Sequence, residues 1–221
     1  MKLYAITDAS QLSRIPADAC DALVALAREW AASGVDYIQI REKALLSRAL
    51  EALAGRIMEA VPAEKRLAAT KVLVNGRADI ALAAGADGVH LPASGALTPG
   101  EVVALFAACG RVNPVISVAC HSIQDIEAAR DAGVSMALFA PVFGKRLSST
   151  ESNGSLPGVG LQELEKTCRA AGSMPVFALG GVTGENAASC IDAGAAGVAA
   201  IRLFHSNRWK TLAFAKPGEA F

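Results

Sequence analysis

The chain has 221 residues, 52% of them apolar and 19% charged, and its 21 basic and 21 acidic residues balance. This composition is that of a globular protein, and it excludes a disordered or collagen-like chain. The balanced charge and the 5% aromatic content argue against a nucleic-acid partner, which would need basic patches and stacking rings. No apolar run approaches the roughly 20 residues of a membrane span, and the N-terminus lacks a signal-peptide pattern. We therefore expect a cytoplasmic protein without a membrane partner.

Five scattered cysteines form no C-x-x-C pair, so the sequence predicts neither a zinc site nor a redox dithiol. We expect reduced thiols in packing roles. They are Cys20, Cys109, Cys120, Cys168 and Cys190.

The first half of the chain alternates short apolar runs with stretches rich in Ala and Leu at helical spacing. Thr98, Pro99 and Glu101 form the pattern of a capping box with proline at the first helical position. Gly85 follows a helical stretch, as a residue that ends a helix does. We expect strands at 2–7, 35–41, 71–74 and 87–91, and helices at 17–33, 46–61, 78–84 and 99–109.

The second half continues the same alternation after one interruption. Residues 141–160 lack apolar periodicity, and a loop of that length in a compact domain is usually functional or disordered. We expect strands at 114–120, 134–140, 174–179 and 197–201, helices at 122–133, 161–171, 185–193 and 202–214, and a frayed tail at 215–221.

Eight strand–helix units in one chain of this length predict a single-domain (β/α)₈ TIM barrel spanning residues 1–221. A doubly wound open sheet is the alternative. That fold would need a Gly-rich phosphate loop after the first strand, and residues 7–10 (TDAS) do not resemble one.

Polar residues follow the carboxyl ends of the expected strands, which in a barrel meet at one end, called the mouth here. The set is rich in cations and amides and poor in carboxylates, which favours an anionic, phosphorylated substrate. It comprises Thr7, Asp8, Gln39, Arg41, Lys43, Asn75, Arg77, His90, Ser94, His121, Lys145, Arg146 and Arg202.

Gly180 and Gly181 follow the seventh strand, and Ile201 and Arg202 follow the eighth. Barrels of this kind often bind phosphate there through backbone N–H groups. We expect a phosphate at these four residues, although a tight turn alone would also explain two glycines.

His121 ends the fifth strand and is the candidate for proton transfer, because imidazole titrates near neutral pH. A structural or substrate-orienting role is the alternative. Alternation along the strand sends the neighbouring Cys120 to the opposite face, so we expect no Cys–His nucleophile pair.

Other polar residues also have a structural alternative. His90 lies within an apolar run, and we interpret it as a hydrogen-bonded packing histidine. Gln39 and Arg41 could be satisfied inside the barrel, and Lys145 and Arg146 could be solvated loop charges.

Seven segments, taken together, resemble the thiamine phosphate synthase/TenI family, whose fold is a (β/α)₈ barrel. They cover nearly the whole chain in order. They are LYAITD (3–8), QIREK (39–43), VNGRADIAL (74–82), ADGVHLP (86–92), APVF (140–143), FALGGVT (177–183) and GVAAI (197–201).

The resemblance implies one of two activities. The synthase joins an aminopyrimidine diphosphate to a thiazole phosphate, using Mg²⁺ held by two aspartates. Gly76 and either Ser94 or Gly95 stand at those positions here, so we expect no metal unless the chain is a synthase. The synthase's serine corresponds to Ala119, and its Pro-Thr-x-Thr-Lys loop corresponds to residues 144–148.

TenI-type proteins isomerise the thiazole carboxylate phosphate, share the Asn-Gly-Arg segment, and place a catalytic histidine where His121 stands. We therefore expect a thiazole tautomerase with His121 as acid and base. The resemblance leaves the synthase open as the alternative, because it matches Gln39, Arg41, Lys43 and Asn75 with residues that grip the diphosphate.

A phosphate-binding or regulatory homologue without catalysis is the third class. The expected substrate-binding residues are Gln39, Arg41, Lys43, Asn75, Arg77 and Lys145. The sequence does not fix the oligomeric state, and pairing of helix faces into a homodimer is compatible with it.

Overall fold

Eight parallel strands close into a barrel in the computed structural model, which describes residues 1–13, 15–61, 70–146 and 155–213. Neighbouring strands follow the order β1-β10-β9-β6-β5-β4-β3-β2, and β2 pairs with β1 to close the ring. The strands are β1 (Lys2–Ile6), β2 (Tyr37–Ile40), β3 (Lys71–Asn75), β4 (Gly88–Leu91), β5 (Val115–Cys120), β6 (Met136–Phe139), β9 (Val176–Leu179) and β10 (Gly197–Ala200).

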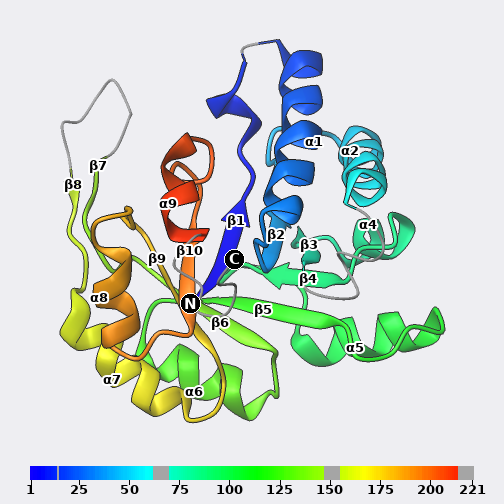
Figure 1. The fold of residues 1–221 in the computed structure, drawn as a ribbon. Helices are drawn as coiled ribbons and strands as arrows, with labels where there is room; N and C mark the ends of the chain where they lie inside the picture. The colour runs from blue at the N-terminus through cyan, green and yellow to red at the C-terminus, as the bar shows by residue number, and fades with distance from the viewer. Residues whose placement is uncertain (14, 62–69, 147–154, 214–221) are drawn as a thin grey trace, which may run out of the picture.

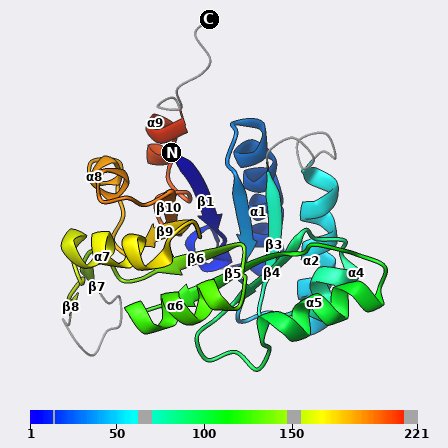
Figure 2. The same cartoon turned by 90° about the horizontal axis from the view of Figure 1, so that it is seen from below.

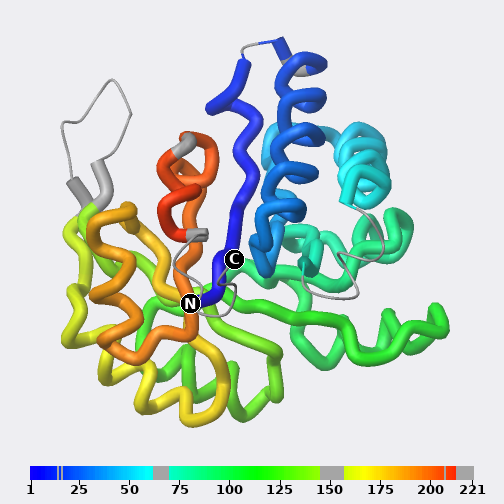
Figure 3. Tube along the Cα trace, in the orientation of Figure 1, coloured from blue at the N-terminus to red at the C-terminus, as the bar shows by residue number. Residues whose placement is uncertain are grey.

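Helices cover the outside of the barrel, with α1, α2, α4 and α5 on one side and α6, α7 and α8 on the other (Figures 1 and 2). The trace runs once around the barrel and returns beside β1 (Figure 3). The prediction of a (β/α)₈ barrel is confirmed, and the open sheet is excluded. The helices are α1 (Pro16–Ala32), α2 (Ser47–Ala60), α4 (Ala78–Ala83), α5 (Pro99–Ala108), α6 (Ile123–Asp131), α7 (Leu161–Ala171), α8 (Ala187–Asp192) and α9 (Lys210–Ala213), with 3-10 turns η1 (Ala9–Gln11) and η2 (Asn207–Trp209).

None of the described helices combines the length and the apolar character that crossing a lipid bilayer requires.

Alternation along the strands divides the apolar residues into two buried layers. One set fills the barrel interior and includes Tyr4, Leu138 and Phe177. The other set, with Leu3 and Trp30 among its members, lies between the strands and the helices. The barrel interior is thus apolar along most of its length, and polar residues take its place only towards the mouth.

Two helices begin where the sequence predicts. The Thr98 hydroxyl accepts a hydrogen bond from the Glu101 N–H at 3.3 Å, and the Glu101 carboxylate accepts one from the Thr98 N–H at 2.7 Å. Ser122 and Asp125 form the equivalent reciprocal pair before α6. Such caps satisfy N–H groups that the first helical turn leaves unpaired, so they fix where these helices start.

Two stretches differ from the sequence-based expectation. Within 141–160, β7 (Lys145–Arg146) and β8 (Ser155–Leu156) pair antiparallel, and strands this short carry no alternation to detect. The helix expected at 202–214 is shorter, because the chain first turns at 201–206, where the Phe204 N–H donates to the Ile201 carbonyl at 3.1 Å. The tail expected at 215–221 and the loop residues 147–154 lie outside the described residues.

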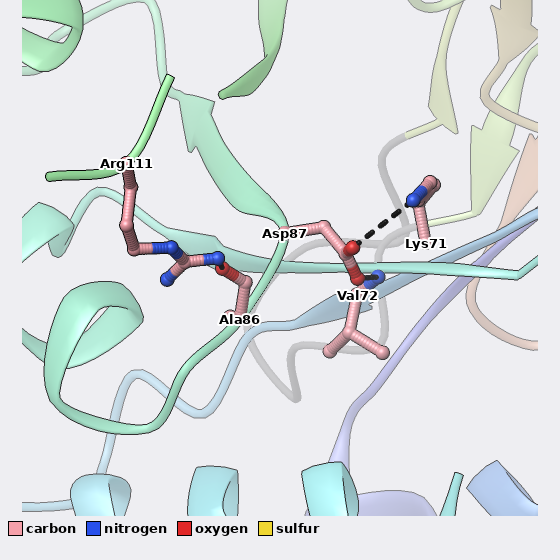
Figure 4. Close-up of polar contacts among 5 residues, drawn as sticks. All are labelled: Lys71, Val72, Ala86, Asp87 and Arg111. Atoms are coloured by element: carbon pink, nitrogen blue, oxygen red, sulfur yellow. Dashed lines mark hydrogen bonds and ion pairs between the residues drawn. The ribbon is translucent and has the colours of Figure 1, made fainter. Parts of the chain in front are cut away.

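The end of the barrel opposite the mouth is held by polar contacts around Asp87 (Figure 4). Its carboxylate accepts hydrogen bonds from the Val72 N–H at 2.9 Å and from the Lys71 ammonium at 3.2 Å. The Arg111 guanidinium donates to the Ala86 carbonyl at 2.6 Å. The residue that precedes β4 is therefore tied to the start of β3.

The same arrangement occurs before two other strands. Asp36 precedes β2 and accepts from the Leu3 N–H of β1 at 2.7 Å. Ser135 precedes β6 and accepts from the Ile116 N–H of β5 at 3.0 Å. Three successive strand pairs are thus joined by a side-chain acceptor at this rim.

Candidate active site

Four polar side chains replace apolar residues on the inner face of neighbouring strands, three of them near the strand ends at the mouth and one, Ser117, within β5. Gln39 lies on β2, Asn75 on β3, His90 on β4 and Ser117 on β5. Asn75 pairs in register with His90, and His90 with Ser117. The sequence predicts the first three at the mouth, and the structure brings them together with Ser117, which sequence reasoning missed because it lies within an apolar strand.

Gln39 and Asn75 form a pair of side-chain amides. The Gln39 Nε2 donates to Asn75 Oδ1 at 3.0 Å. Gln39 is only 1% exposed, and its Oε1 is buried without a hydrogen-bond donor among the described residues. Leaving a buried acceptor without a donor costs roughly 1–3 kcal/mol.

His90 is buried and hydrogen-bonded, as the packing interpretation predicts. Its Nδ1 lies 2.9 Å from the Ser117 hydroxyl, which in turn lies 3.0 Å from the Tyr4 hydroxyl. Burial lowers the pKa of His90 to about 4, and the positive charge of Arg41 acts in the same direction. His90 is therefore neutral at neutral pH.

The low pKa of His90 predicts a loss of stability in acid. The unfolded chain, with an ordinary histidine pKa near 6.5, binds the proton more readily than the folded one. The free energy of unfolding should therefore fall as pH drops from about 6.5 towards about 4, by up to ~3 kcal/mol from this residue. Denaturant titrations of the wild type and of His90→Gln at several pH values isolate the effect, since the variant should lack this component. If the free energy of unfolding depended on pH equally in the wild type and in His90→Gln, the low pKa of His90 would be contradicted.

The segment after β2 carries two cations of the predicted site. Arg41 is partly buried and close enough to His90 to affect its pKa, whereas Lys43 is exposed. Between them, Glu42 points the other way and is buried. Its carboxylate accepts hydrogen bonds from the Thr7 hydroxyl at 2.6 Å and from the Ala9 N–H at 2.9 Å.

Glu42 is a residue that sequence reasoning missed. Burial raises the pKa of Glu42, although its hydrogen bonds from Thr7 and Ala9 act in the opposite direction. Its position in the segment after β2, beside the end of β1, was the available signal, because β1 and β2 are neighbouring strands.

His121 is exposed after β5, and its ring orientation is fixed by a backbone group. Its Nδ1 lies 2.7 Å from the Ala140 carbonyl oxygen. Because a carbonyl only accepts, the neutral ring must carry its proton on Nδ1, which leaves Nε2 as the basic nitrogen. The geometry is that of a group able to take up a proton.

Cys120 confirms the predicted division of faces at the end of β5. It is 1% exposed and packs between strands and helices. Burial raises the pKa of the Cys120 thiol to about 12, so a thiolate nucleophile is not formed at neutral pH.

Gly180 and Gly181 adopt positive φ angles of 94° and 65°. A Cβ at Gly180 would lie 2.8 Å from the Pro141 Cα, and one at Gly181 would lie 2.7 Å from the Phe143 Cβ. Both positions therefore require glycine for packing as well as for conformation. Ile201 is partly buried and Arg202 is exposed, and the phosphate site stays a prediction.

One predicted substrate-binding residue, Arg77, makes its hydrogen bonds away from the amide pair. The Arg77 guanidinium binds the Asp79 carboxylate at 2.6 and 2.9 Å and the Ser47 hydroxyl at 2.9 Å. These partners lie on α4 and at the start of α2. Lys145 lies on β7, and its side chain is outside the described part of the structure.

Within the described ranges, no group of three or more His, Cys, Asp or Glu side chains is arranged to hold a metal ion.

Comparison with known proteins gives concordant matches. The profile of the family described as "Thiamine monophosphate synthase" matches residues 3–204. "Putative thiamine-phosphate synthase 2" of Aquifex aeolicus is 33% identical over 205 residues, which cover 92% of this chain and 97% of that protein. "Thiamine-phosphate synthase" of Methanoculleus marisnigri is 40% identical over 179 residues, covering 80% of this chain and 77% of that protein. The solved structure of "Thiamine phosphate pyrophosphorylase from Pyrococcus furiosus" superposes with a TM-score of 0.73 at 23% identity, covering 96% of this chain and 91% of that one.

Proposed function

Because the chain belongs to the thiamine monophosphate synthase family, we propose that it joins a thiazole phosphate to an aminopyrimidine diphosphate, the condensation for which its relatives are named. It is a thiamine-pathway enzyme. The tautomerase expected from the sequence becomes the second candidate, because the names of the relatives support the condensation better.

The contact between Gln39 and Asn75, with Arg41 beside it, is the observation that carries this proposal. The family resemblance matches these residues with those that grip the diphosphate, and a tautomerase need not keep all of them. Leaving pyrophosphate carries several negative charges, which amide donors and guanidinium groups stabilise.

The Mg²⁺ that the family resemblance implies does not fit this chain. Gly76 stands at the first aspartate position with a φ of 65°, and a Cβ there would lie 3.6 Å from the Pro92 ring. Ser94 and Gly95 stand at the second position and offer no carboxylate. Mg²⁺ is usually held through one or two carboxylates, so the charge of the diphosphate would fall to Arg41 and Lys43.

The proposed reaction uses the residues of the mouth as follows. Backbone groups near Gly180 and Gly181 bind the thiazole phosphate. The thiazole nitrogen attacks the methylene carbon of the pyrimidine, and the bond from this carbon to the diphosphate oxygen breaks. The electron pair leaves with that oxygen, and Arg41 and Lys43 stabilise the charge that develops there.

Tautomerisation of a thiazole carboxylate phosphate is the second candidate, and the orientation of His121 favours it. This reaction removes a proton from one position and delivers it to another, which a single base can do. The basic Nε2 of His121 suits that task.

One assay separates the candidates. Purified protein is given either both condensation substrates or the thiazole tautomer alone, with and without EDTA. We expect thiamine phosphate to form only with both substrates, and EDTA to have no effect because metal carboxylates are lacking. Isomerisation without condensation would support the second candidate instead. Binding of thiazole phosphate without any turnover would overturn both and leave the non-catalytic homologue.

A further inference from the structure

We propose that Thr7 and Glu42 form a buried relay that orients Arg41 towards the diphosphate, which makes both of them positioning residues. This inference rests on the proposed function, since it concerns the anion that Arg41 would hold.

The relay consists of three hydrogen bonds between segments far apart in sequence. The Thr7 hydroxyl donates to Glu42 Oε1 at 2.6 Å and accepts from the Arg41 N–H at 2.9 Å. The second carboxylate oxygen, Oε2, accepts from the Ala9 N–H at 2.9 Å. Thr7 therefore uses both its donor and its acceptor to tie the end of β1 to the segment after β2.

The burial of Thr7 and Glu42 indicates that they orient Arg41 rather than stabilise the fold. Thr7 is 0% exposed and Glu42 is 9% exposed, and burying a carboxylate costs free energy even when it is hydrogen-bonded. Apolar residues would fill the same space without that cost. The Thr7 hydroxyl accepts the hydrogen bond from the Arg41 N–H, and Glu42 in turn accepts from that hydroxyl and so orients it. A backbone held at this point fixes the origin of the arginine side chain.

The charges around Glu42 agree with this arrangement. Arg41 is the neighbouring cation, and Asp8 is the neighbouring anion. Cys20 on α1 is also close to Glu42. Burial is the main cause of the raised pKa of the Cys20 thiol, and the negative charge of Glu42 is the next. The Glu42 carboxylate already has hydrogen bonds from Thr7 and Ala9. Among the described residues, the Arg41 guanidinium has no hydrogen bond of its own to this carboxylate, so we infer that it is available to a ligand.

The test replaces the threonine by its isostere. Thr7→Val keeps the volume but removes the hydroxyl, so the Arg41 N–H and one carboxylate oxygen lose their partner. We expect the Kd for inorganic pyrophosphate, measured by calorimetry, to rise about tenfold, which corresponds to one lost hydrogen bond in a charged network. Turnover with both condensation substrates is measured in parallel, and kcat/KM should fall by a similar factor.

Thr70→Val is the matched control. Thr70 is also 0% exposed, and its hydroxyl donates to the Val35 carbonyl at 2.7 Å, at the opposite end of the barrel. Both variants lose one buried hydroxyl, so both should melt at a lower temperature. Only Thr7→Val should lose affinity for pyrophosphate.

Each outcome decides one question. Equal pyrophosphate affinity in Thr7→Val and Thr70→Val would overturn the relay and leave the proposed function standing. A wild type that binds pyrophosphate without turnover, with Thr7→Val weakened, would overturn the condensation and support the relay. A wild type that binds no pyrophosphate would overturn both. If Thr7→Val does not fold, Glu42→Gln serves instead, because its amide nitrogen cannot accept the hydrogen bond from the Ala9 N–H and the carboxylate charge is lost. We then expect the Kd for pyrophosphate to rise in Glu42→Gln, and an unchanged Kd would overturn the relay.

Discussion

Replacing Arg41 with methionine is expected to lower kcat/KM for the condensation by about 10²–10³-fold, the usual effect of removing one group that stabilises developing charge. Methionine keeps an unbranched side chain of similar reach, so the packing after β2 changes little. The loss should appear in kcat as well as in KM, because the negative charge on the leaving oxygen is greatest in the transition state. Steady-state kinetics with both substrates measures it.

Arg28→Met is the control for net charge. Arg28 is exposed on α1, on the outside of the barrel, and removing it lowers the net charge by the same amount. This variant should keep wild-type kinetics. If Arg41→Met also kept wild-type kinetics, the diphosphate would not bind at Arg41. The arrangement of Gln39, Asn75 and Arg41 would then no longer support the proposed function.

Replacing His121 with alanine should leave condensation nearly unchanged and lower any tautomerase turnover by about 10²–10⁴-fold, the range for general acid–base catalysis by one side chain. Affinity for the thiazole substrate should stay close to that of the wild type, because the imidazole would act in the transition state rather than in binding. Rates of isomerisation and calorimetric affinities measured on the same preparation test both statements.

His121→Gln separates proton transfer from packing. The glutamine amide can donate to the Ala140 carbonyl as the imidazole Nδ1 does, but it has no nitrogen that accepts a proton near neutral pH. It should therefore be as slow as His121→Ala. Full isomerisation by either variant would exclude His121 as the base.

The barrel could be predicted from the sequence because local signals agreed with one another. Apolar runs marked the strands, and capping patterns such as Thr98 with Glu101 marked helix starts. The pairing of β7 with β8 could not be predicted, because two-residue strands have no periodicity. The late start of α9 was missed for a similar reason, since turns and helices share the residues at 201–206.

The candidate site was predicted in part, through the rule that polar residues at strand ends converge. That rule found Gln39, Asn75 and His121. It did not reveal that Arg77 pairs with Asp79, two residues away, because a surface ion pair leaves no pattern in an alternating segment. The contact between Thr7 and Glu42 joins residues that are 35 positions apart, and the parallel pairing of β1 with β2 brings them together.

The double glycine shows why a motif can have more than one cause. Because Gly180 and Gly181 follow the seventh strand of the barrel, the sequence predicted a phosphate site there. The structure adds that Pro141 and Phe143 leave no room for a Cβ there. A substitution at either glycine would therefore disturb the fold as well as any bound phosphate.

The side-chain acceptors that precede β2, β4 and β6 join the strands in pairs at the end of the barrel opposite the mouth. Each one ties a strand to the strand before it in the chain, so the βαβ unit is closed within itself at this rim. The equivalent residue before β10 is Ala196, whose side chain cannot accept a hydrogen bond. The unit formed by β9 and β10 thus lacks a side-chain hydrogen bond of this kind, and Gly180 and Gly181 follow its first strand. The amide pair of Gln39 and Asn75 therefore lies on strands that this rim closes by side-chain contacts, whereas the double glycine follows a strand of the unit that it does not close in this way.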